Sequence, residues 1–214
     1  MDEDTKVDGG RRAEKIREEY AVVLDYLPNG SGSMPMYKRV PVAQTVGEHY
    51  FVLLEVSPKD EATFDLHERV YVGDGERPKV KTIRRRVRYD ELSNTSKKEL
   101  EEAIEQIIET QEQRFVDFYN KSRAISLKHH QLELLPKIGK KHLISILDER
   151  EIEPFKSFKD INARVKGMPD AKELVTERVL EEIEGKELDH RLFVPDFGKE
   201  DEERNNRRGH NRRR

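Results

Sequence analysis

The chain has 214 residues, of which 40% are charged and only 34% are hydrophobic, and its formal net charge is −3. A chain of this length forms one large domain or two small ones, and the low apolar share predicts solvated helix surface or disordered tails. The absence of cysteine excludes disulfide scaffolds, thiol catalysis and cysteine-ligated zinc or iron–sulfur sites, and the small net charge does not by itself indicate a nucleic-acid binder.

The first part of the chain shows strand signals. Residues 1–17 are predicted to be a disordered lead-in, because two adjacent glycines there break any helix. Five segments rich in β-branched and aromatic residues follow, separated by glycine and proline turns, at 20–27, 40–46, 50–56, 69–73 and 79–89. Five short strands with such turns predict a small barrel of the oligonucleotide-binding (OB) or S1 type over residues 18–92.

A helical pattern begins after the barrel. Apolar residues recur at helical spacing up to Phe118, and Ser96 with Glu99 fits a capping box, so we predict one helix over about 96–121. This connecting amphipathic helix is assigned to 93–122. The carboxylates of 99–112 lie opposite the apolar stripe and are interpreted as a solvated face.

Two short helical hairpins follow over 123–187. In the first, Pro136 ends a helix, Gly139 offers a position where φ can be positive or where another backbone can approach closely, and a second helix starts at Lys140. The second unit is predicted by aligning Gly167 with Gly139. Residues 188–214 form a C-terminal extension in which 192–195 are apolar enough to dock on the body, and 199–214 are an expected disordered, arginine-rich tail.

The segment 134–140, Leu-Leu-Pro-Lys-Ile-Gly-Lys, resembles the helix-hairpin-helix nucleic-acid-binding motif, with Lys137 standing where the first glycine is common. The second unit keeps Gly167 and has Pro169 where an N–H donor would be useful. The order of barrel, long helix and tandem hairpins resembles an archaeal family called "domain of unknown function 655". This resemblance covers about 18–195.

The expected fold class is therefore α+β: a small five-stranded OB-like β-barrel, a long helix, and a tandem helix-hairpin-helix α-domain. The family resemblance implies an archaeal source and nucleic-acid binding, with RNA expected rather than DNA. It also implies a role in translation or RNA metabolism, with ribosomal or transcription-related protein partners. It implies no known reaction.

The predicted contacts to a nucleic-acid backbone lie in the two hairpins and in the basic run of the last predicted strand. Such contacts give affinity without sequence choice. The residues are Lys137, Ile138, Gly139, Lys140, Lys141, Lys166, Gly167, Lys79, Lys81, Arg84, Arg85, Arg86 and Arg88. The hairpins have an alternative interpretation as packing devices, and the basic run has one as a solvated edge that blocks strand pairing. The arginine-rich tail could add nonspecific attraction to RNA or be merely solvated.

The sequence shows no phosphate-binding loop, nucleophile elbow or zinc-protease motif. His129 and His130 diverge on a helix, so we expect no metal, no cofactor and no catalytic residue. No apolar run approaches the ~18 residues of a bilayer span, and we expect a cytoplasmic protein without membrane contacts. A protein-interaction module in a translation or transcription assembly is the alternative function. A nuclease or DNA-repair accessory is a weaker third option.

Overall fold

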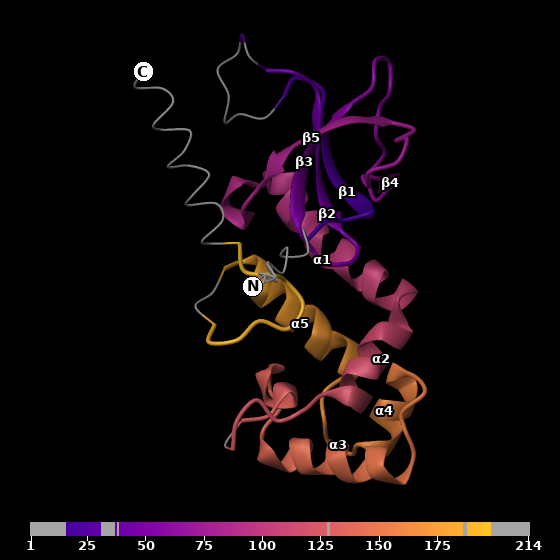
Figure 1. Ribbon diagram of the computed structural model, residues 1–214, viewed down its shortest axis with the longest axis vertical. Helices are drawn as coiled ribbons and strands as arrows, with labels where there is room; N and C mark the ends of the chain where they lie inside the picture. Colours follow the sequence, from indigo (N-terminus) through magenta and orange to yellow (C-terminus); the bar gives the residue numbers. More distant parts are fainter. Residues whose placement is uncertain (1–15, 31–36, 38, 128, 186–187, 198–214) are drawn as a thin grey trace, which may run out of the picture.

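A computed structural model describes residues 16–30, 37, 39–127, 129–185 and 188–197. Most of the predicted disordered lead-in, and the predicted arginine-rich tail from 199 on, lie outside the described residues. The described chain is elongated, with a β-sheet at one end and a group of helices at the other (Figure 1). Helix α5 (Ala171–Ile183), the last helix of the described residues, returns from the helical end toward the sheet.

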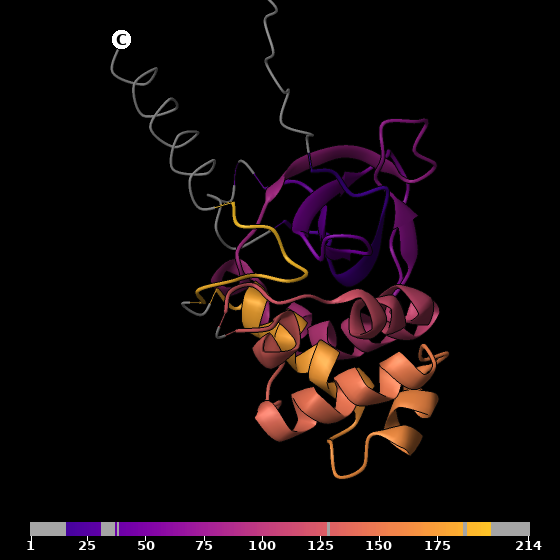
Figure 2. The same ribbon diagram turned by 60° about the horizontal axis from the view of Figure 1, so that its bottom comes forward.

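The β-part is one five-stranded antiparallel sheet. Its strands are β1 (Tyr20–Leu27), β2 (Val42–Gly47), β3 (Leu53–Pro58), β4 (Arg69–Tyr71) and β5 (Val80–Arg86). The strand order is β4-β1-β2-β3-β5, so the first four strands form a Greek key and β5 joins the β3 edge. The sheet curls strongly on itself (Figure 2). The predicted five strands and the α+β class are confirmed, while the OB type of the barrel stays a prediction.

Both faces of the curled sheet are buried. On β1, Ala21 and Val23 point into an apolar cluster inside the curl, where they meet Val56 and Val70. Residues that alternate with them, such as Val22, belong to a second cluster formed with the helices. This two-sided burial explains why β1 has an almost continuous apolar run rather than a strict alternation.

The predicted single helix is two helices, α1 (Asn94–Thr110) and α2 (Glu112–Lys121), because the chain leaves helical geometry at Gln111. The capping box predicted at Ser96 is also wrong. Ser93 is the N-cap, and its hydroxyl accepts the Ser96 N–H at 3.0 Å. The Ser96 side chain is buried and donates instead to Gln44 of β2, which fixes the start of α1 on the sheet.

The remaining helices form the end of the molecule opposite the sheet. They are the 3₁₀ helix η3 (Gln131–Leu134), α3 (Lys140–Ile152), α4 (Phe158–Arg164) and α5, while a further 3₁₀ turn, η2 (Tyr89–Glu91), precedes α1. One continuous apolar cluster runs from the outer face of the sheet through α1 and α2 into these helices. Sheet and helices therefore share a core.

Three of the carboxylates predicted to be a solvated face, two on α1 and one at the start of α2, have partners in the helical end. Lys172 of α5 pairs with Glu109 at 2.7 Å and with Glu105 at 3.3 Å. Glu112 accepts the backbone N–H of Phe158 at 2.8 Å at the start of α4. The side chains of Glu105 and Glu109 stay 41% and 61% exposed, as a solvated face requires, but these carboxylates also dock helices. That docking role was not predicted because the partners lie far along the chain.

The predicted docking of 192–195 is confirmed for Phe193 and Val194, which are buried. The buried carboxylate of Glu182 accepts three successive backbone N–H groups, from Leu192, Phe193 and Val194, at 2.7–2.9 Å. Arg178 donates to the same carboxylate at 2.8 Å. None of the helices in the described ranges has both the length and the apolar character of a membrane span.

Candidate nucleic-acid interface

The first hairpin connects η3 to α3 through five residues. Leu135 and Ile138 are buried on either side of the turn, and the Ile138 N–H donates to the Leu135 carbonyl at 3.3 Å. The residue between them that takes a left-handed conformation is Lys137, with φ of 62°, whereas Gly139 has an extended φ of −99°. Both predicted roles of Gly139 are therefore wrong, because its φ is not positive and a Cβ added there would meet nothing within 4 Å.

The second hairpin shows which residues of the two units correspond. Gly167 has φ of 76° and stands two residues after buried Val165, as Lys137 stands two residues after buried Leu135. Gly167 therefore matches Lys137 and not Gly139. In the first unit a lysine therefore has a left-handed backbone conformation that glycine adopts without strain.

The N-terminus of α3 is open. Its N-cap is Gly139, which has no side chain to accept the N–H groups of the first helical turn. The unsatisfied amides and the helix dipole make such an end favourable for an anion. Lys140 and Lys141 are exposed there, and among the described residues no carboxylate pairs with either side chain. Lys137 is also exposed, but its ammonium pairs with Glu177 of α5.

The N-terminus of α5, in the second hairpin, differs from that of α3 because an acidic side chain caps it. Asp170 is the N-cap, and its carboxylate accepts the N–H groups of Lys172 at 2.9 Å and of Glu173 at 3.2 Å. Asn162 accepts the Ala171 N–H at 2.9 Å. The predicted site residues Lys166 and Gly167 are exposed beside this turn, but the amides of α5 are already satisfied.

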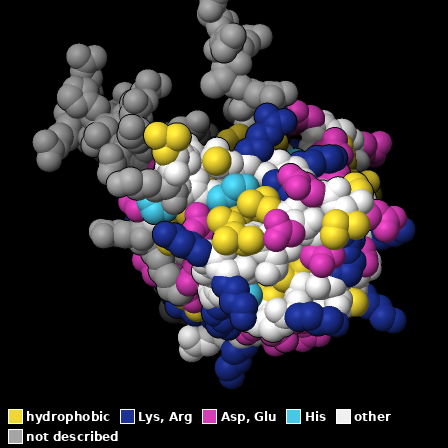
Figure 3. Space-filling model, turned by 90° about the horizontal axis from the view of Figure 1, so that it is seen from below, with side chains coloured by type: hydrophobic (Ala, Val, Ile, Leu, Met, Phe, Trp, Pro, Cys, Tyr) yellow, Lys and Arg dark blue, Asp and Glu magenta, His cyan; other side chains and the backbone are white. Residues whose placement is uncertain are grey.

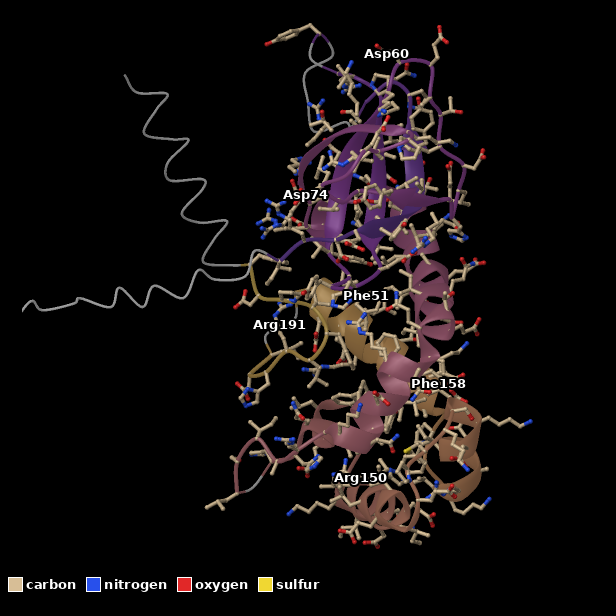
Figure 4. The ribbon with its side chains drawn as sticks, turned by 45° about the vertical axis from the view of Figure 1, so that its right-hand side comes forward. Phe51, Asp60, Asp74, Arg150, Phe158 and Arg191 are labelled. Atoms are coloured by element: carbon tan, nitrogen blue, oxygen red, sulfur yellow. The ribbon has the colours of Figure 1, made fainter. Side chains whose placement is uncertain are left out.

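The first hairpin is held rigidly against α2. Arg150 of α3 donates to the Tyr119 carbonyl at 2.8 Å and to the Ser122 hydroxyl at 3.1 Å, and Figure 4 shows it within the helical end. His130, the buried N-cap of η3, accepts the Leu132 N–H at its Nδ1 at 3.1 Å. Burial and the nearby Arg150 lower the pKa of His130, which keeps the ring neutral for this bond.

The basic run on β5 and its flanks is largely paired. Arg85 contacts Glu91 at 2.5 Å and shares the buried Glu55 with Arg84, each at 3.5 Å. Arg86 stacks on the ring of Phe197 at 3.9 Å. The other three predicted residues also meet carboxylates: Lys79 with Glu68, Lys81 with Asp60, and Arg88 with Asp90. The run is therefore a neutralised surface rather than a bare cationic groove.

A cleft of about 980 Å³ lies beside this run, at the end of the sheet near the loop that carries Asp60 (Figure 4). Four basic and three acidic side chains line it, together with the apolar surfaces of Tyr26, Val40 and Pro41. A mixed lining with an aromatic ring suits a flat group carrying negative charge nearby.

The face opposite the sheet combines charge and apolar surface. Seen from below, dark-blue lysine and arginine side chains surround a region where yellow hydrophobic side chains and magenta acids are also exposed (Figure 3). Ile144 of α3 is 57% exposed and Leu127 fully exposed in this helical end. The N-terminus of α3 therefore belongs to the helical end, whose surface offers both basic and apolar side chains to a binding partner.

Comparison with known proteins defines the family of the chain. The profile of the family described as "Protein of unknown function (DUF655)" matches residues 17–195. The chain is 40% identical over 178 residues to the uncharacterised protein MJ0038 of Methanocaldococcus jannaschii, covering 83% of this chain and 80% of that protein. It is also similar to the crystal structure of Af1531 from Archaeoglobus fulgidus, with 43% identity and a TM-score of 0.76 over 83% of this chain and all of that one. The chain belongs to the DUF655 family.

Proposed function

We propose that this protein binds the phosphate backbone of nucleic acid, RNA in preference to DNA, at the first hairpin. The observation that carries the proposal is the open N-terminus of α3, where Gly139 leaves the first amides without a side-chain acceptor. Exposed Lys140 and Lys141 stand at the same helix end. The protein acts as a binding module in translation or RNA metabolism and performs no chemistry on its ligand.

The two hairpins contribute unequally to this function. A phosphate at α3 meets free amides and positive side chains, which together give affinity without reading the base sequence. A phosphate at α5 would meet the carboxylate of Asp170, which already holds the amides. Lys166 therefore adds a long-range positive charge at most, Gly167 adds none, and the first hairpin is the main contact.

The basic sheet surface is the second contact of the proposal. Arg84 is exposed and contacts Glu55 at 3.5 Å, a distance longer than an optimal charge-assisted hydrogen bond, whereas Arg85 is also held by Glu91 at 2.5 Å. A phosphate can therefore compete for the guanidinium group of Arg84. The adjacent cleft with Tyr26 offers a ring on which a base of a single strand stacks. This combination favours single-stranded RNA over duplex DNA.

The test is a salt titration of the affinity for single-stranded RNA, duplex RNA and DNA, comparing the parent with Lys140→Glu plus Lys141→Glu. Acidic residues at the first positions of a helix favour the dipole, so the double variant should fold. We expect weaker binding and a salt slope reduced by about 1.4 for single strands, since each lost phosphate contact removes about 0.7. Lys98→Glu plus Lys159→Glu, two exposed lysines on α1 and α4, is the charge-matched control.

The proposal fails if the folded double variant binds RNA with the affinity and salt slope of the parent. It also fails for the hairpin if the control variant loses as much affinity, because the effect would then reflect net charge alone.

A protein-interaction module is the second candidate function. The exposed apolar side chains Leu127, Ile144 and Ile152, at 106%, 57% and 79%, favour it, because each could be buried against a partner. Absence of RNA binding below about 100 μM would support this candidate, since that is weaker than ordinary nonspecific association.

A further inference from the structure

We infer that His67, Glu99 and Glu102 form a binding site for one divalent transition-metal ion between the sheet and helix α1. His67 lies in the connection from β3 to β4, and the two glutamates lie on α1. Within the described residues, these three side chains bring one potential ligand atom each to within 4.8 Å of one another. The inference is independent of nucleic-acid binding at the hairpin.

The helix spacing presents both glutamates to the histidine. Residues three apart on a helix lie on the same face, so Glu99 and Glu102 point the same way from α1. The Glu99 Oε2 atom lies 3.3 Å from Nε2 of His67, and the Glu102 Oε1 atom lies 3.9 Å from Nδ1. Tetrahedral zinc with bonds of about 2.0–2.2 Å separates neighbouring ligand atoms by roughly 3.3–3.5 Å. The first pair already has this spacing.

A second observation concerns Nε2 of His67. This atom is buried and makes no hydrogen bond within the described residues, and the Glu99 carboxylate at 3.3 Å is its nearest charged neighbour. Buried polar atoms are rarely left in this state, and an ion is one of the few groups that satisfies them. Nδ1 faces the side-chain amide nitrogen of Gln106 at 3.5 Å. Turning this amide so that its oxygen accepts from Nδ1–H would fix the tautomer that leaves Nε2 free to bind a metal.

The backbone at His67 also supports the assignment. Its φ is 57°, a left-handed conformation that side-chain-bearing residues rarely adopt. The His67 N–H and the Glu68 carbonyl bond to the Val23 backbone at 2.8 Å and 3.0 Å, so β1 holds the turn in place. Strain of this kind clusters at functional sites. Here it directs the ring at α1.

The donor set selects the class of ion. One imidazole nitrogen with two carboxylates suits Zn²⁺ or Mn²⁺, whereas Mg²⁺ and Ca²⁺ prefer oxygen alone. Glu99 is largely buried and sets the position, while Glu102 has a side chain that is 64% exposed and can swing onto the ion. Water fills the remaining coordination positions, as in sites with three protein ligands. The bound ion would join the β3–β4 connection to α1.

The test uses the full-length, tag-free chain after chelation. Calorimetry and thermal unfolding are measured with Zn²⁺, Mn²⁺ and Mg²⁺, and Co²⁺ absorption reports the geometry. We expect one equivalent of Zn²⁺ or Mn²⁺ to bind, with a Tm increase of about 5–10 °C when free metal exceeds Kd a hundredfold. His67→Gln and Glu99→Gln should each weaken binding by at least about 100-fold, since loss of even an outer-shell partner costs 10–100-fold.

The matched controls are Glu101→Gln, an exposed carboxylate on the same helix turn, and His129→Gln, an exposed histidine in the helical end. Both should bind metal like the parent. The inference is overturned if the parent binds none of the ions, or if His67→Gln and Glu99→Gln keep the parent affinity. Binding of Mg²⁺ alone, unaffected by His67→Gln, also overturns it.

Discussion

Because the N-terminus of α3 has no side-chain cap, we predict two opposite effects of Gly139→Asp. The variant should be more stable than the parent and should bind RNA less tightly. The variant copies Asp170, whose carboxylate accepts two amides of α5. Gly139 has φ of −99° and ψ of 179°, a conformation open to any residue, and a Cβ there meets nothing within 4 Å. The new side chain therefore enters without strain.

The magnitudes follow from this geometry. An Asp cap improves on glycine by a few tenths of a kcal/mol, and a carboxylate at a helix N-terminus adds about 0.3–1 kcal/mol. Replacing a glycine also reduces the entropy of the unfolded chain, worth about 0.4–1 kcal/mol. The total is about 1–2 kcal/mol, or a Tm increase of about 2–8 °C for a chain of this size.

The effect on binding has the opposite sign. The carboxylate takes the amides and repels a phosphate, and hydrogen bonds to charged groups are worth about 1.5–3 kcal/mol, so we expect at least a tenfold loss of affinity. Fluorescence anisotropy with labelled single-stranded RNA measures the affinity, and thermal unfolding measures the stability. Gly139→Ala adds a Cβ without an acceptor and should bind like the parent. A stabilised Gly139→Asp variant that binds RNA as tightly as the parent would refute the reasoning.

Three further predictions concern stability. Lys137→Gly should raise the free energy of unfolding by up to about 1 kcal/mol in urea denaturation, because glycine relieves the left-handed strain; a clear loss of stability would contradict this explanation. His130 has a lowered pKa in the folded state, so its contribution to stability is present above the ordinary value of 6.5 and is lost as pH falls through the folded pKa. His130→Asn keeps an acceptor for the Leu132 N–H and should lose stability less steeply between about pH 7 and 5 than the parent; equal slopes would disprove this role. Glu182→Gln removes the nearest counter-charge of buried Arg178 and leaves it Glu181 at 3.9 Å, which should cost up to about 3–5 kcal/mol and expose residues 188–197 to limited proteolysis; an unchanged digestion pattern would argue against this role of Glu182.

The five strands could be predicted from the sequence because the β-rich runs are separated by glycine and proline turns. Tertiary contacts moved their ends: β3 begins three residues later than predicted and continues to Pro58, and β2 continues to Gly47. The long helix was predicted as one piece because the apolar period continues through Gln111. Its break depends on distant contacts: Gln111 and Arg114 donate to the Glu48 carbonyl in the β2–β3 turn at 3.1 Å and 3.3 Å. Such contacts leave no trace in local periodicity.

The candidate site was predicted in part. Lys140 and Lys141 stand at an open helix end as the motif indicates, but the positive φ was assigned to Gly139 because it is the glycine of that turn. The burial of the residues on either side of Lys137 imposes that conformation on a lysine. An acidic residue before a helix is an N-cap signal, so Asp170 could have been found from sequence. The pairing of the basic strand could not, because its carboxylates come from other strands and loops.

The shared core of sheet and helices has a mechanical consequence. Because apolar packing is continuous from the outer face of the sheet to the hairpins, the two proposed contact surfaces cannot hinge independently. The fold therefore fixes the distance between the two surfaces. A strand too short to reach from one to the other gains the affinity of a single contact, whereas a strand that spans both gains the effective concentration of the second. Affinity should therefore rise in a step with RNA length rather than gradually.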